Sequence, residues 1–518
     1  MQTGVVTREV TSWKRQPRLG FLRARLGFLR KSQHMNVLFI YSQHHIQSVL
    51  EPLENPELIY FGISYISSVL KESGHHTSLV VLSRISGKKN RKIIDEKLKS
   101  FKPELICFSA VASEYAFISD LAKYIKKSNE NIYLMIGGPH VSLQPENVLL
   151  NGFDALCIGE GEYPTLELIE QLKEGKSPSK IPNLWIKRGL EIEKNPPRPF
   201  IRDLDTLPFP DRDIWEDWIE QKEGRCSVLL GRGCPFRCSY CSNHALGKLA
   251  SGAYVRLRSP DNIVEEIKII LEKHPDLKEI YLEVETLGVN KKWAIKLCSK
   301  LEQLNASLAV PISYGTNIRI TPNADLEELF SCLQKSNFTF INIGLESGSE
   351  RVRNEILNRK YSNQDIINAV SLARKYGMKI SLLNMLGLPG ETLDDFKKTV
   401  EVNRQCLPDW TFPSIYYPYP GTDLYSLCIE KGLLKDNVGL EVGIERKNAA
   451  LDLPGFSKKQ IQKSYTWFLY DVYRGVWPTH KILLKVIKTK LMSYYFISHY
   501  YRKMTPMFLR RFMQKFMR

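Results

Sequence analysis

The chain has 518 residues, 43% of them hydrophobic and 25% charged, and a formal net charge of +17. These values are typical of a globular protein of roughly three domains. Seven of the ten cysteines are scattered singly, which excludes a disulfide framework and indicates a reducing compartment, so we expect a cytoplasmic protein.

The positive charge lies at the two ends of the chain. Residues 1–34 carry eight Lys or Arg and one Glu, and residues 472–518 carry eleven Lys or Arg and no acidic residue, so the rest is nearly neutral. A nearly neutral body argues against a nucleic-acid partner. The basic ends suit peripheral contact with an anionic membrane surface, on the inner membrane face, or serve to keep a helix solvated.

The basic N-terminal extension, residues 1–34, contains the sequence Arg-Leu-Gly-Phe-Leu-Arg twice, at 18–23 and 25–30. This period of seven predicts a short basic helix with Leu and Phe on one face. No long apolar stretch follows, so the segment is neither a signal peptide nor a transmembrane helix. Because Met35 directly precedes the first strong strand, residues 1–34 are either a native extension or an over-extended reading frame.

Residues 35–175 alternate between apolar runs and helical segments such as Tyr115–Lys127. This alternation predicts a parallel, doubly wound, Rossmann-like α/β domain. The five predicted strands are Asn36–Tyr41, Thr77–Leu82, Glu104–Ala110, Ile132–Gly138 and Asp154–Gly159.

Ligands of such sheets bind beyond the carboxyl ends of the strands. Glycines there let a ligand approach the backbone closely, and a small hydroxyl can contact a nucleotide tail. The candidate binding residues are Ser109, Gly137, Gly138, Gly159 and Gly161, together with His44 after the first strand.

A linker, residues 176–215, precedes a loop with three cysteines. Cys234, Cys238 and Cys241 have the spacing C-x3-C-x2-C, with Tyr240 directly before the third cysteine and no fourth cysteine nearby. A structural zinc site needs a fourth ligand, which His244 could supply, whereas a four-iron cluster held by three cysteines keeps one iron open for a small molecule. The three thiols therefore predict a 4Fe–4S centre, with zinc as the alternative.

This loop resembles the signature of the radical S-adenosylmethionine (SAM) superfamily. The resemblance implies that the three cysteines hold the cluster and that its open iron binds SAM. One electron, from a donor such as flavodoxin or ferredoxin, would then cleave SAM to a 5'-deoxyadenosyl radical. The protein would align the cofactors and exclude water.

The domain before this loop, joined to it through Leu207–Arg212, resembles the cobalamin-binding domain of cobalamin-dependent radical SAM enzymes. Domains that ligate cobalt from below often carry D-x-H-x-x-G, whereas the loop here reads Ser42-Gln-His-His-Ile-Gln47, without that Asp and Gly. A ligating His needs an orienting partner. We therefore expect cobalamin without a protein imidazole ligand, with ligation by His44 and a domain without any corrin as the alternatives.

Residues 216–430 alternate again and suit the partial (β/α)6 barrel of this superfamily, with its active site at the carboxyl ends of the strands. The motifs Gly344–Gly348 and Gly387–Thr392 each follow a predicted strand. The six predicted strands are Ser227–Leu230, Glu279–Val284, Ala309–Thr316, Phe340–Leu345, Lys379–Leu386 and Phe412–Tyr416.

The resemblance assigns barrel residues to SAM. Glu346 and Ser347 would face its ribose or amino group, and Gly387 would support its adenine side. Arg319 would pair with the SAM carboxylate or form a surface ion pair, and Tyr240 adjoins the cluster.

Two further groups of side chains near the strand ends have alternative explanations. Glu283 and Glu285 share a strand face, and they point either into the barrel or into a salt bridge. Tyr416, Tyr417 and Tyr419 line a substrate channel or pack in the core.

Residues 431–518 form a helical, basic C-terminal region. Its amphipathic helix has lysines on one face and apolar residues on the other. The lysines are Lys481, Lys485 and Lys488, and the apolar residues are Leu483, Leu484, Ile487 and Leu491. The aromatic residues that follow are Tyr494, Tyr495, Phe496, Tyr500 and Tyr501, interleaved with Arg502, Lys503, Arg510 and Arg511. This region is either a helix that lies in a membrane interface or one that caps the barrel with its apolar face.

The expected protein is a cobalamin-dependent radical SAM enzyme that activates an unreactive carbon for methyl transfer from methylcobalamin. Its substrate would be a small molecule, a lipid or an isoprenoid. Cyclisation, oxidation or rearrangement without methyl transfer, as in anaerobic porphyrin-ester cyclases, is the alternative. A tRNA methylthiotransferase would need a second three-cysteine site, where this chain has only Cys107 and Cys157, and a non-catalytic corrin-binding regulator would not need the cysteine loop.

Overall fold

The computed structural model describes residues 34–42, 59–82, 84, 87–148, 152–219, 224–434, 446–494 and 497. The chain divides into two units, Met1–His34 and Met35–Arg518, and the structure described below belongs to the second. His44, the basic repeat of residues 18–30 and the aromatic and basic residues from 498 onward lie outside the described residues.

The first sheet contains the five strands that the sequence predicts. They pair in the order β2-β1-β3-β4-β5, and all of these pairs are parallel. Their bounds are β1 Asn36–Ser42, β2 His76–Leu82, β3 Leu105–Ser109, β4 Tyr133–Gly137 and β5 Ala155–Cys157. In this topology the strand order reverses between β1 and β3, which is where doubly wound sheets bind their ligands.

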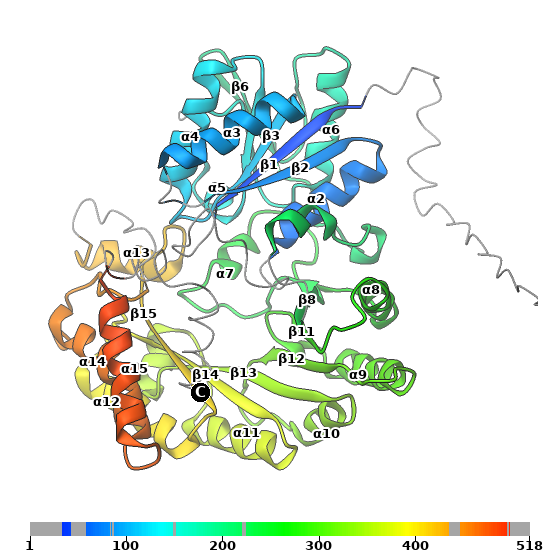
Figure 1. Ribbon diagram of the computed structural model, residues 1–518. Coiled ribbons are helices and arrows are strands. Elements are labelled where there is room, and N and C mark those ends of the chain that lie inside the picture. The colour runs from blue at the N-terminus through cyan, green and yellow to red at the C-terminus, as the bar shows by residue number, and fades with distance from the viewer. Residues whose placement is uncertain are drawn as a thin grey trace, which may run out of the picture. The chain divides into compact units, whose positions relative to one another are not determined.

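Helices cover both faces of the first sheet, as its continuous apolar strands require. In β1, Val37 and Phe39 pack in a core with residues of α2 and α6, while Leu38 and Ile40 pack with residues of α3 and α4 (Figure 1). The helix bounds are α2 Phe61–Glu72, α3 Gly87–Phe101, α4 Tyr115–Ser128 and α6 Glu162–Lys173.

Part of the segment that the sequence predicts as a linker belongs to this sheet. β6 Leu184–Arg188 pairs antiparallel with β5, and β7 Glu191–Lys194 pairs antiparallel with β6. Gly189 has a φ of +61° in the tight turn between them. These strands are short, and most of their exposed positions carry charged side chains, so their sequence resembles that of a linker.

The second sheet contains six parallel strands in the order β15-β14-β13-β12-β11-β8. Their bounds are β8 Arg225–Leu229, β11 Glu279–Glu283, β12 Ser313–Ile318, β13 Phe338–Glu346, β14 Lys379–Leu386 and β15 Trp410–Ile415. All six were predicted, although β12 begins four residues after the predicted start. β8 and β15 are the edge strands, so the barrel is a partial one.

Five helices lie along the outer face of this sheet (Figure 1). They are α8 Pro260–Lys273, α9 Lys291–Ala306, α10 Glu327–Lys335, α11 Asn363–Lys375 and α12 Leu393–Cys406. Capping boxes begin α11, with Ser362 and Asp365, and α12, with Thr392 and Asp395. The core between the strands and these helices contains Ile341, Ile380 and Leu382, so the alternate strand residues face the concave inner side.

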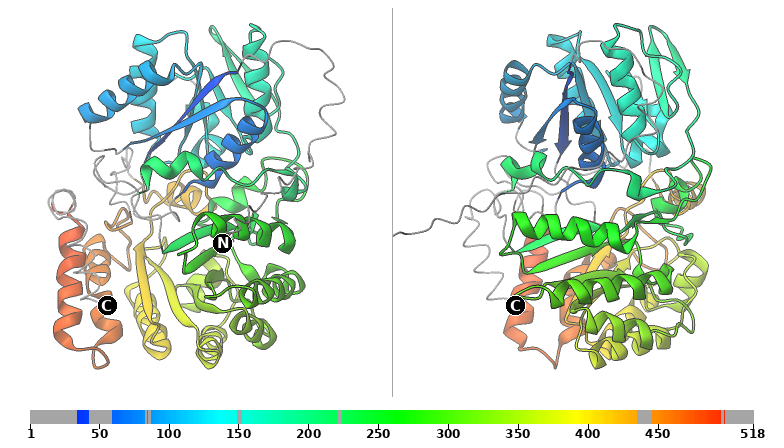
Figure 2. Two further views of the ribbon diagram at one scale, coloured as in Figure 1. Left: turned by 45° about the vertical axis from the view of Figure 1, so that its right-hand side comes forward. Right: turned by 90° about the vertical axis from the view of Figure 1, so that its right-hand side faces the viewer.

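Three helices complete the described chain, and α14 and α15 lie beside β15 (Figure 2). They are α13 Asp423–Glu430, α14 Lys458–Tyr473 and α15 Thr479–Met492. Of the two alternatives for this region, packing of the predicted apolar face of α15 on the barrel is contradicted by the exposure of that face. Ile482 and Val486 are buried instead, whereas Leu484, Ile487 and Leu491 are 47%, 54% and 43% exposed. No helix among the described residues has the length and apolar character to cross a membrane.

Candidate active site

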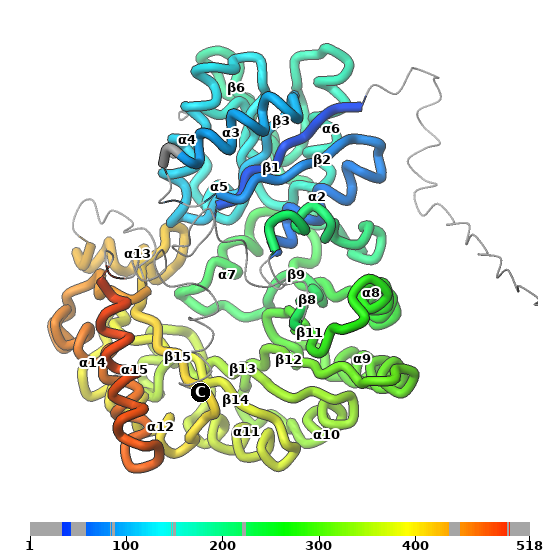
Figure 3. Tube along the Cα trace, in the orientation of Figure 1, coloured from blue at the N-terminus to red at the C-terminus, as the bar shows by residue number. Residues whose placement is uncertain are grey.

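The three cysteines lie in the loop between β9, Gly231–Arg232, and α7, Ser242–Leu246, which can be followed along the tube in Figure 3. Cys238 is buried, and Cys234 and Cys241 are half-buried. Gly233 has a φ of +84°, and a Cβ there would collide with the Tyr254 carbonyl. The turn that starts the loop therefore requires glycine.

The loop is held against the segment that follows the Gly344–Gly348 motif. Asn358 Nδ2 donates to the Arg237 carbonyl at 2.8 Å, and the Ser239 N–H donates to the Leu357 carbonyl at 3.3 Å. These bonds bring two motifs that are more than a hundred residues apart in the sequence into one site.

Arg319 lies beside the cysteine loop rather than in a surface ion pair. Its Nη1 donates to Cys238 Sγ at 2.7 Å, and its guanidinium stacks 3.7 Å from the centre of the Phe236 ring.

The surroundings of Cys234 and Cys241 disfavour their thiolate forms. Burial raises the pKa of Cys241 to about 11, and it also raises the pKa of Cys234. His244, the fourth ligand of the zinc alternative, has its Nε2 3.4 Å from Asp423 Oδ2. Among the residues described, no three His, Cys, Asp or Glu side chains form a ligand set for one metal ion.

A buried arginine connects the cysteine loop to Glu346. Arg359 Nη1 donates to the Tyr240 hydroxyl and to Glu346 Oε1, each at 2.8 Å, and Nη2 donates to the Gly344 carbonyl at 3.0 Å. Burial, followed by the charge of Glu346, raises the pKa of Tyr240 well above its usual value, so the phenol remains protonated. Arg359 was not predicted, because no local motif contains it.

Glu346 occupies an uncommon backbone conformation. Its φ is +60°, and the register between β13 and β14 shifts between Gly344 and Glu346. A Cβ on Gly344 would collide with Glu346 Oε1 and lie 3.2 Å from Arg359 Nη2. The ion pair therefore lies over Gly344 on the inner side of the barrel. Left-handed conformations of residues other than glycine concentrate at functional sites.

The structure does not bring Ser347 to this inner surface. Its side chain is fully buried, and its hydroxyl accepts from the Ser349 N–H at 3.2 Å and lies 3.5 Å from Thr399 Oγ1. Ser347 thus stabilises the turn that carries Glu346.

Gly387 ends β14 with a φ of +76°. Its N–H donates to Glu391 Oε2 at 2.6 Å, and the Leu388 N–H donates to the same oxygen at 3.1 Å. Burial raises the pKa of Glu391 to about 8. Glu391 was not predicted, and it holds the predicted glycine turn in place.

The remaining barrel candidates divide between the surface and the core. Glu285 is exposed at the end of β11, where its charge contributes to the raised pKa values of Cys234 and Cys241 after burial. Tyr416 and Tyr417 are buried, and Tyr416 belongs to the core around α14, which favours core packing over a channel. The Tyr417 and Tyr419 rings lie 5.2 Å apart.

The five predicted residues of the first sheet lie together at the carboxyl ends of β3, β4 and β5. Gly138 has a φ of +100°, and a Cβ there would lie 2.7 Å from the Ala110 carbonyl oxygen and 2.9 Å from Ser109 Oγ. The Gly159 N–H donates to Ser142 Oγ at 3.0 Å. A Cβ on Gly161 would lie 2.8 Å from Ile66. The glycines at Gly138 and Gly161 therefore let these loops pack closely, with no room for a side chain at either position.

An ion-pair network joins this surface to the cysteine loop. Arg232 Nη1 and Arg256 Nη1 donate to Glu160 Oε1 at 2.8 and 2.9 Å, and Arg232 Nη2 donates to Glu162 Oε1 at 2.5 Å. Arg232 ends β9, and Arg256 begins β10 Arg256–Leu257, which pairs with β9. Burial alone would raise the pKa of Glu160, but the two arginines hold it below its ordinary value. The network was not predicted.

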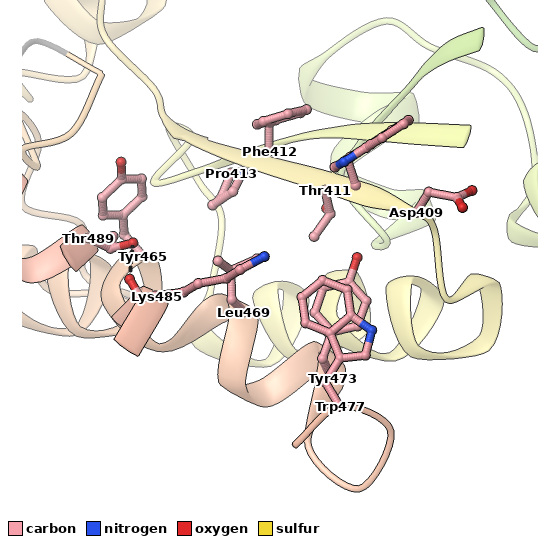
Figure 4. A pocket seen from close by; sticks show the side chains of 11 residues that line it. Asp409, Thr411, Phe412, Pro413, Tyr465, Leu469, Tyr473, Trp477, Lys485 and Thr489 are labelled. Atoms are coloured by element: carbon pink, nitrogen blue, oxygen red, sulfur yellow. Dashed lines mark hydrogen bonds between the residues drawn. The ribbon is translucent and has the colours of Figure 1, made fainter. Parts of the chain in front are cut away.

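A cavity among the described residues lies apart from this site. It has a volume of about 270 Å³ and lies between β15 and the helices α14 and α15 (Figure 4). Thr411, Pro413, Tyr473 and Lys485 are among the residues that line it. None of the predicted cofactor residues lines this cavity.

Comparisons with known proteins match both halves of the chain. The family model for the B12 binding domain matches residues 56–169, and the model for the radical SAM superfamily matches residues 228–402. An uncharacterized methyltransferase of Pyrococcus horikoshii is 28% identical over 434 residues, which cover 82% of this chain and 89% of that protein.

Two further proteins are similar over most of the chain. The anaerobic magnesium-protoporphyrin IX monomethyl ester cyclase of Rubrivivax gelatinosus is 24% identical over 404 residues, covering 76% of this chain and 69% of the cyclase. The radical SAM methyltransferase TsrM of Kitasatospora setae, solved with cobalamin and a [4Fe-4S] cluster, superimposes with a TM-score of 0.64 at 15% identity, covering 86% of this chain and 90% of TsrM.

Proposed function

Because this chain belongs to the radical SAM enzymes that carry a B12-binding domain, we propose that it transfers a methyl group to an unreactive carbon of a small molecule. Its cofactors are a 4Fe–4S cluster, SAM and cobalamin. When bound, they supply a 5'-deoxyadenosyl radical and a methyl group on cobalt.

The residues at the cysteine loop suit the cluster. Cys234, Cys238 and Cys241 supply three thiols and no fourth cysteine, the donor set of a cluster with one open iron. We assign these three residues to the iron–sulfur cluster, and Arg319 to the positioning of the loop through its contacts with Cys238 and Phe236.

We assign Glu346 to SAM. Its Oε1 is bound to Arg359, so Oε2 is the atom that would accept from the SAM ribose or amino group. Arg359 positions Glu346 and Tyr240 relative to each other, and Gly387 supports the adenine side. Arg319 remains the candidate partner of the SAM carboxylate, a role that is compatible with its contact to Cys238.

Gly137, Gly138, Gly159, Gly161 and Ser109 are the residues that we assign to cobalamin. The support is the crowded backbone at Gly138, where a Cβ would fill the space beside Ser109. Because the surface lies at the carboxyl edge of a sheet with the order 2-1-3-4-5, it is also where that topology places a ligand.

One ion-pair network connects the cobalamin residues to the cysteine loop, and this observation carries the proposal. In it, Glu160, which follows β5 of the first sheet, contacts Arg232 and Arg256 beside the cysteine loop. Methyl transfer needs both cofactors near one substrate carbon. The similarity to a cyclase supports the second candidate, ring closure or oxidation without methyl transfer.

Labelled SAM separates these functions. The anaerobic holoenzyme is incubated with a small-molecule extract and SAM that carries a deuterated methyl group. Methyl transfer predicts a product with the added deuterated mass, absent in C238A and present in the control C332A, whose cysteine lies outside the loop. A new product without the label would favour the cyclase-type reaction and contradict our proposal.

We further propose a cytoplasmic enzyme that receives its electron from flavodoxin or ferredoxin and contacts an anionic membrane through α15. All ten cysteines are free, which fits a reducing compartment. Leu484, Ile487 and Leu491 form an exposed apolar stripe on a helix with Lys481 and Lys490. We expect the wild-type protein to sediment with anionic vesicles and the L484Q/I487Q variant to stay in solution. Equal sedimentation of the two proteins would contradict the membrane contact.

A further inference from the structure

The inner side of the barrel has an apolar wall. In β14, Ile380 and Leu382 are buried against the outer helices, so Leu383, the residue after Leu382, points to the inner side. In β15, Thr411 and Pro413 point toward α14 and α15, while the Phe412 ring points to the opposite side of the strand (Figure 4).

Leu383 and Phe412 are both partly open to solvent. Leu383 is 37% exposed and Phe412 is 55% exposed. The register places Leu383 directly beside Phe412, so they form one continuous patch. Adjacent large apolar residues that stay open on a concave surface indicate a binding surface for apolar molecules.

The patch adjoins the residues that we assign to SAM. The register pairs Gly344 with Leu383 and Leu383 with Phe412, so the three residues form one row across β13, β14 and β15. The ion pair of Glu346 and Arg359 lies over Gly344 in this row. A molecule on the patch would therefore lie next to SAM.

The neighbouring row carries no charged side chain and consists of Asn317, Asn342, Ser381 and Trp410. Tyr281 donates to Asn317 Oδ1 at 2.6 Å, and Asn342 Nδ2 donates to the Tyr281 hydroxyl at 3.0 Å. Ser381, paired in register with Asn342, is 2% exposed, and its hydroxyl has no hydrogen-bond partner among the described residues. These amides and hydroxyls suit one neutral polar group, such as a hydroxyl or a carbonyl.

We propose that the substrate is a largely hydrocarbon molecule that carries a neutral hydroxyl or carbonyl group. Its apolar part lies on Leu383 and Phe412, and its polar group lies toward Asn342 and Ser381. This proposal rests on the proposed function, because it places the substrate carbon beside the SAM site of the same enzyme.

The first test measures the apolar wall directly. The anaerobic holoenzyme is titrated with the fluorescent hydrocarbon 1,6-diphenylhexatriene, and binding is compared with that of L383Q/F412Q. The matched control is I269Q, since Ile269 is 46% exposed and belongs to α8 on the outer side. We expect about tenfold weaker binding in L383Q/F412Q and no change in I269Q. Equal binding in all three proteins overturns the proposal.

The second test separates this inference from the proposed function. Products from the labelled-SAM incubation are partitioned between chloroform and water, and iron and corrinoid are measured in the same samples. Labelled methyl groups in the chloroform phase support the proposal. Labelled products found only in water would overturn the hydrocarbon substrate while leaving methyl transfer intact, whereas a protein without corrinoid would overturn the proposed function itself.

Discussion

Arg359 joins Tyr240 to Glu346, since its Nη1 lies 2.8 Å from the tyrosine hydroxyl and 2.8 Å from Oε1 of the carboxylate. Tyr240 directly precedes the third cysteine of the loop, and Glu346 ends β13. One guanidinium thus fixes the cluster loop relative to the carboxylate that we assign to SAM.

Replacing Arg359 by methionine is expected to weaken SAM binding by about tenfold. The change removes the contact that orients Glu346 and leaves its carboxylate buried without a cation, which costs about 3 kcal/mol of stability. R359K keeps the charge but not the planar pair of donors, so we expect an intermediate affinity. Isothermal titration with SAM under anaerobic conditions measures both.

The control for this prediction is R351M. Arg351 also forms an ion pair, with Asp395, but it is partly exposed and does not contact the cysteine loop. If R359M binds SAM with the same affinity as R351M and the wild type, Arg359 does not position Glu346.

Glu160 is expected to couple corrinoid binding to the cysteine loop. E160Q removes the charge that pairs with Arg232 and Arg256, and because these groups are largely buried we expect a loss of about 3 kcal/mol of stability. Corrinoid retained per chain after gel filtration should fall. E167Q is the control, since Glu167 pairs with Arg198 at the surface. Equal corrinoid retention in both variants would contradict the coupling.

Gly138 is expected to tolerate no side chain. In G138A the added Cβ meets the Ala110 backbone at 2.7 and 2.8 Å in a left-handed conformation, so we expect a stability loss of about 2 kcal/mol and reduced corrinoid binding. In the control G175A, the glycine also has a positive φ of +70°, but no atom lies within 4 Å of the new Cβ. Full corrinoid loading of G138A, measured by absorbance, would contradict the assignment.

Because the pKa of Glu391 is raised by burial, we expect the stability of the folded protein to depend on pH. Its pKa is raised to about 8 in the folded protein, so the folded state holds a proton that the unfolded state releases near pH 4.5. Stability contributed by the protonated form is therefore lost as the pH rises from about 5 to 8, by on the order of 1 kcal/mol for each pH unit. E391Q mimics the protonated group and should not show this loss.

Thermal unfolding between pH 6 and 8 measures this effect. The difference in Tm between E391Q and the wild type should grow in favour of E391Q as the pH rises. A constant difference across this range would show that Glu391 does not titrate there.

The sequence predicted what local patterns determine. Buried parallel strands are continuous apolar runs, so all eleven parallel strands of the two sheets were found, and the cysteine spacing identified the loop without any structure. The hairpin of β6 and β7 was not predicted, because apolar and polar residues do not alternate regularly along these two strands. The buried face of α15 was misassigned because Ile482 and Val486 are only two of its many apolar residues.

Contacts between distant residues could not be predicted. No motif contains Arg359, and the motif Gly387–Thr392 contains Glu391 without indicating its role, so both roles follow only from burial beside Glu346 and Gly387. The pair of Glu160 with Arg232 joins residues 72 positions apart across two sheets. Ser347 belongs to the same motif as Glu346, but the left-handed backbone at Glu346 turns their side chains to different surroundings.

The iron and corrinoid content per chain shows whether this protein holds both an iron–sulfur cluster and cobalamin. The protein is purified anaerobically from cells supplied with cobalamin, with the C234A/C238A/C241A variant prepared in parallel. We expect about four irons and about one corrinoid per wild-type chain. The variant should lose the iron but keep the corrinoid. Iron without corrinoid in the wild-type protein would contradict an enzyme that transfers a methyl group from cobalamin.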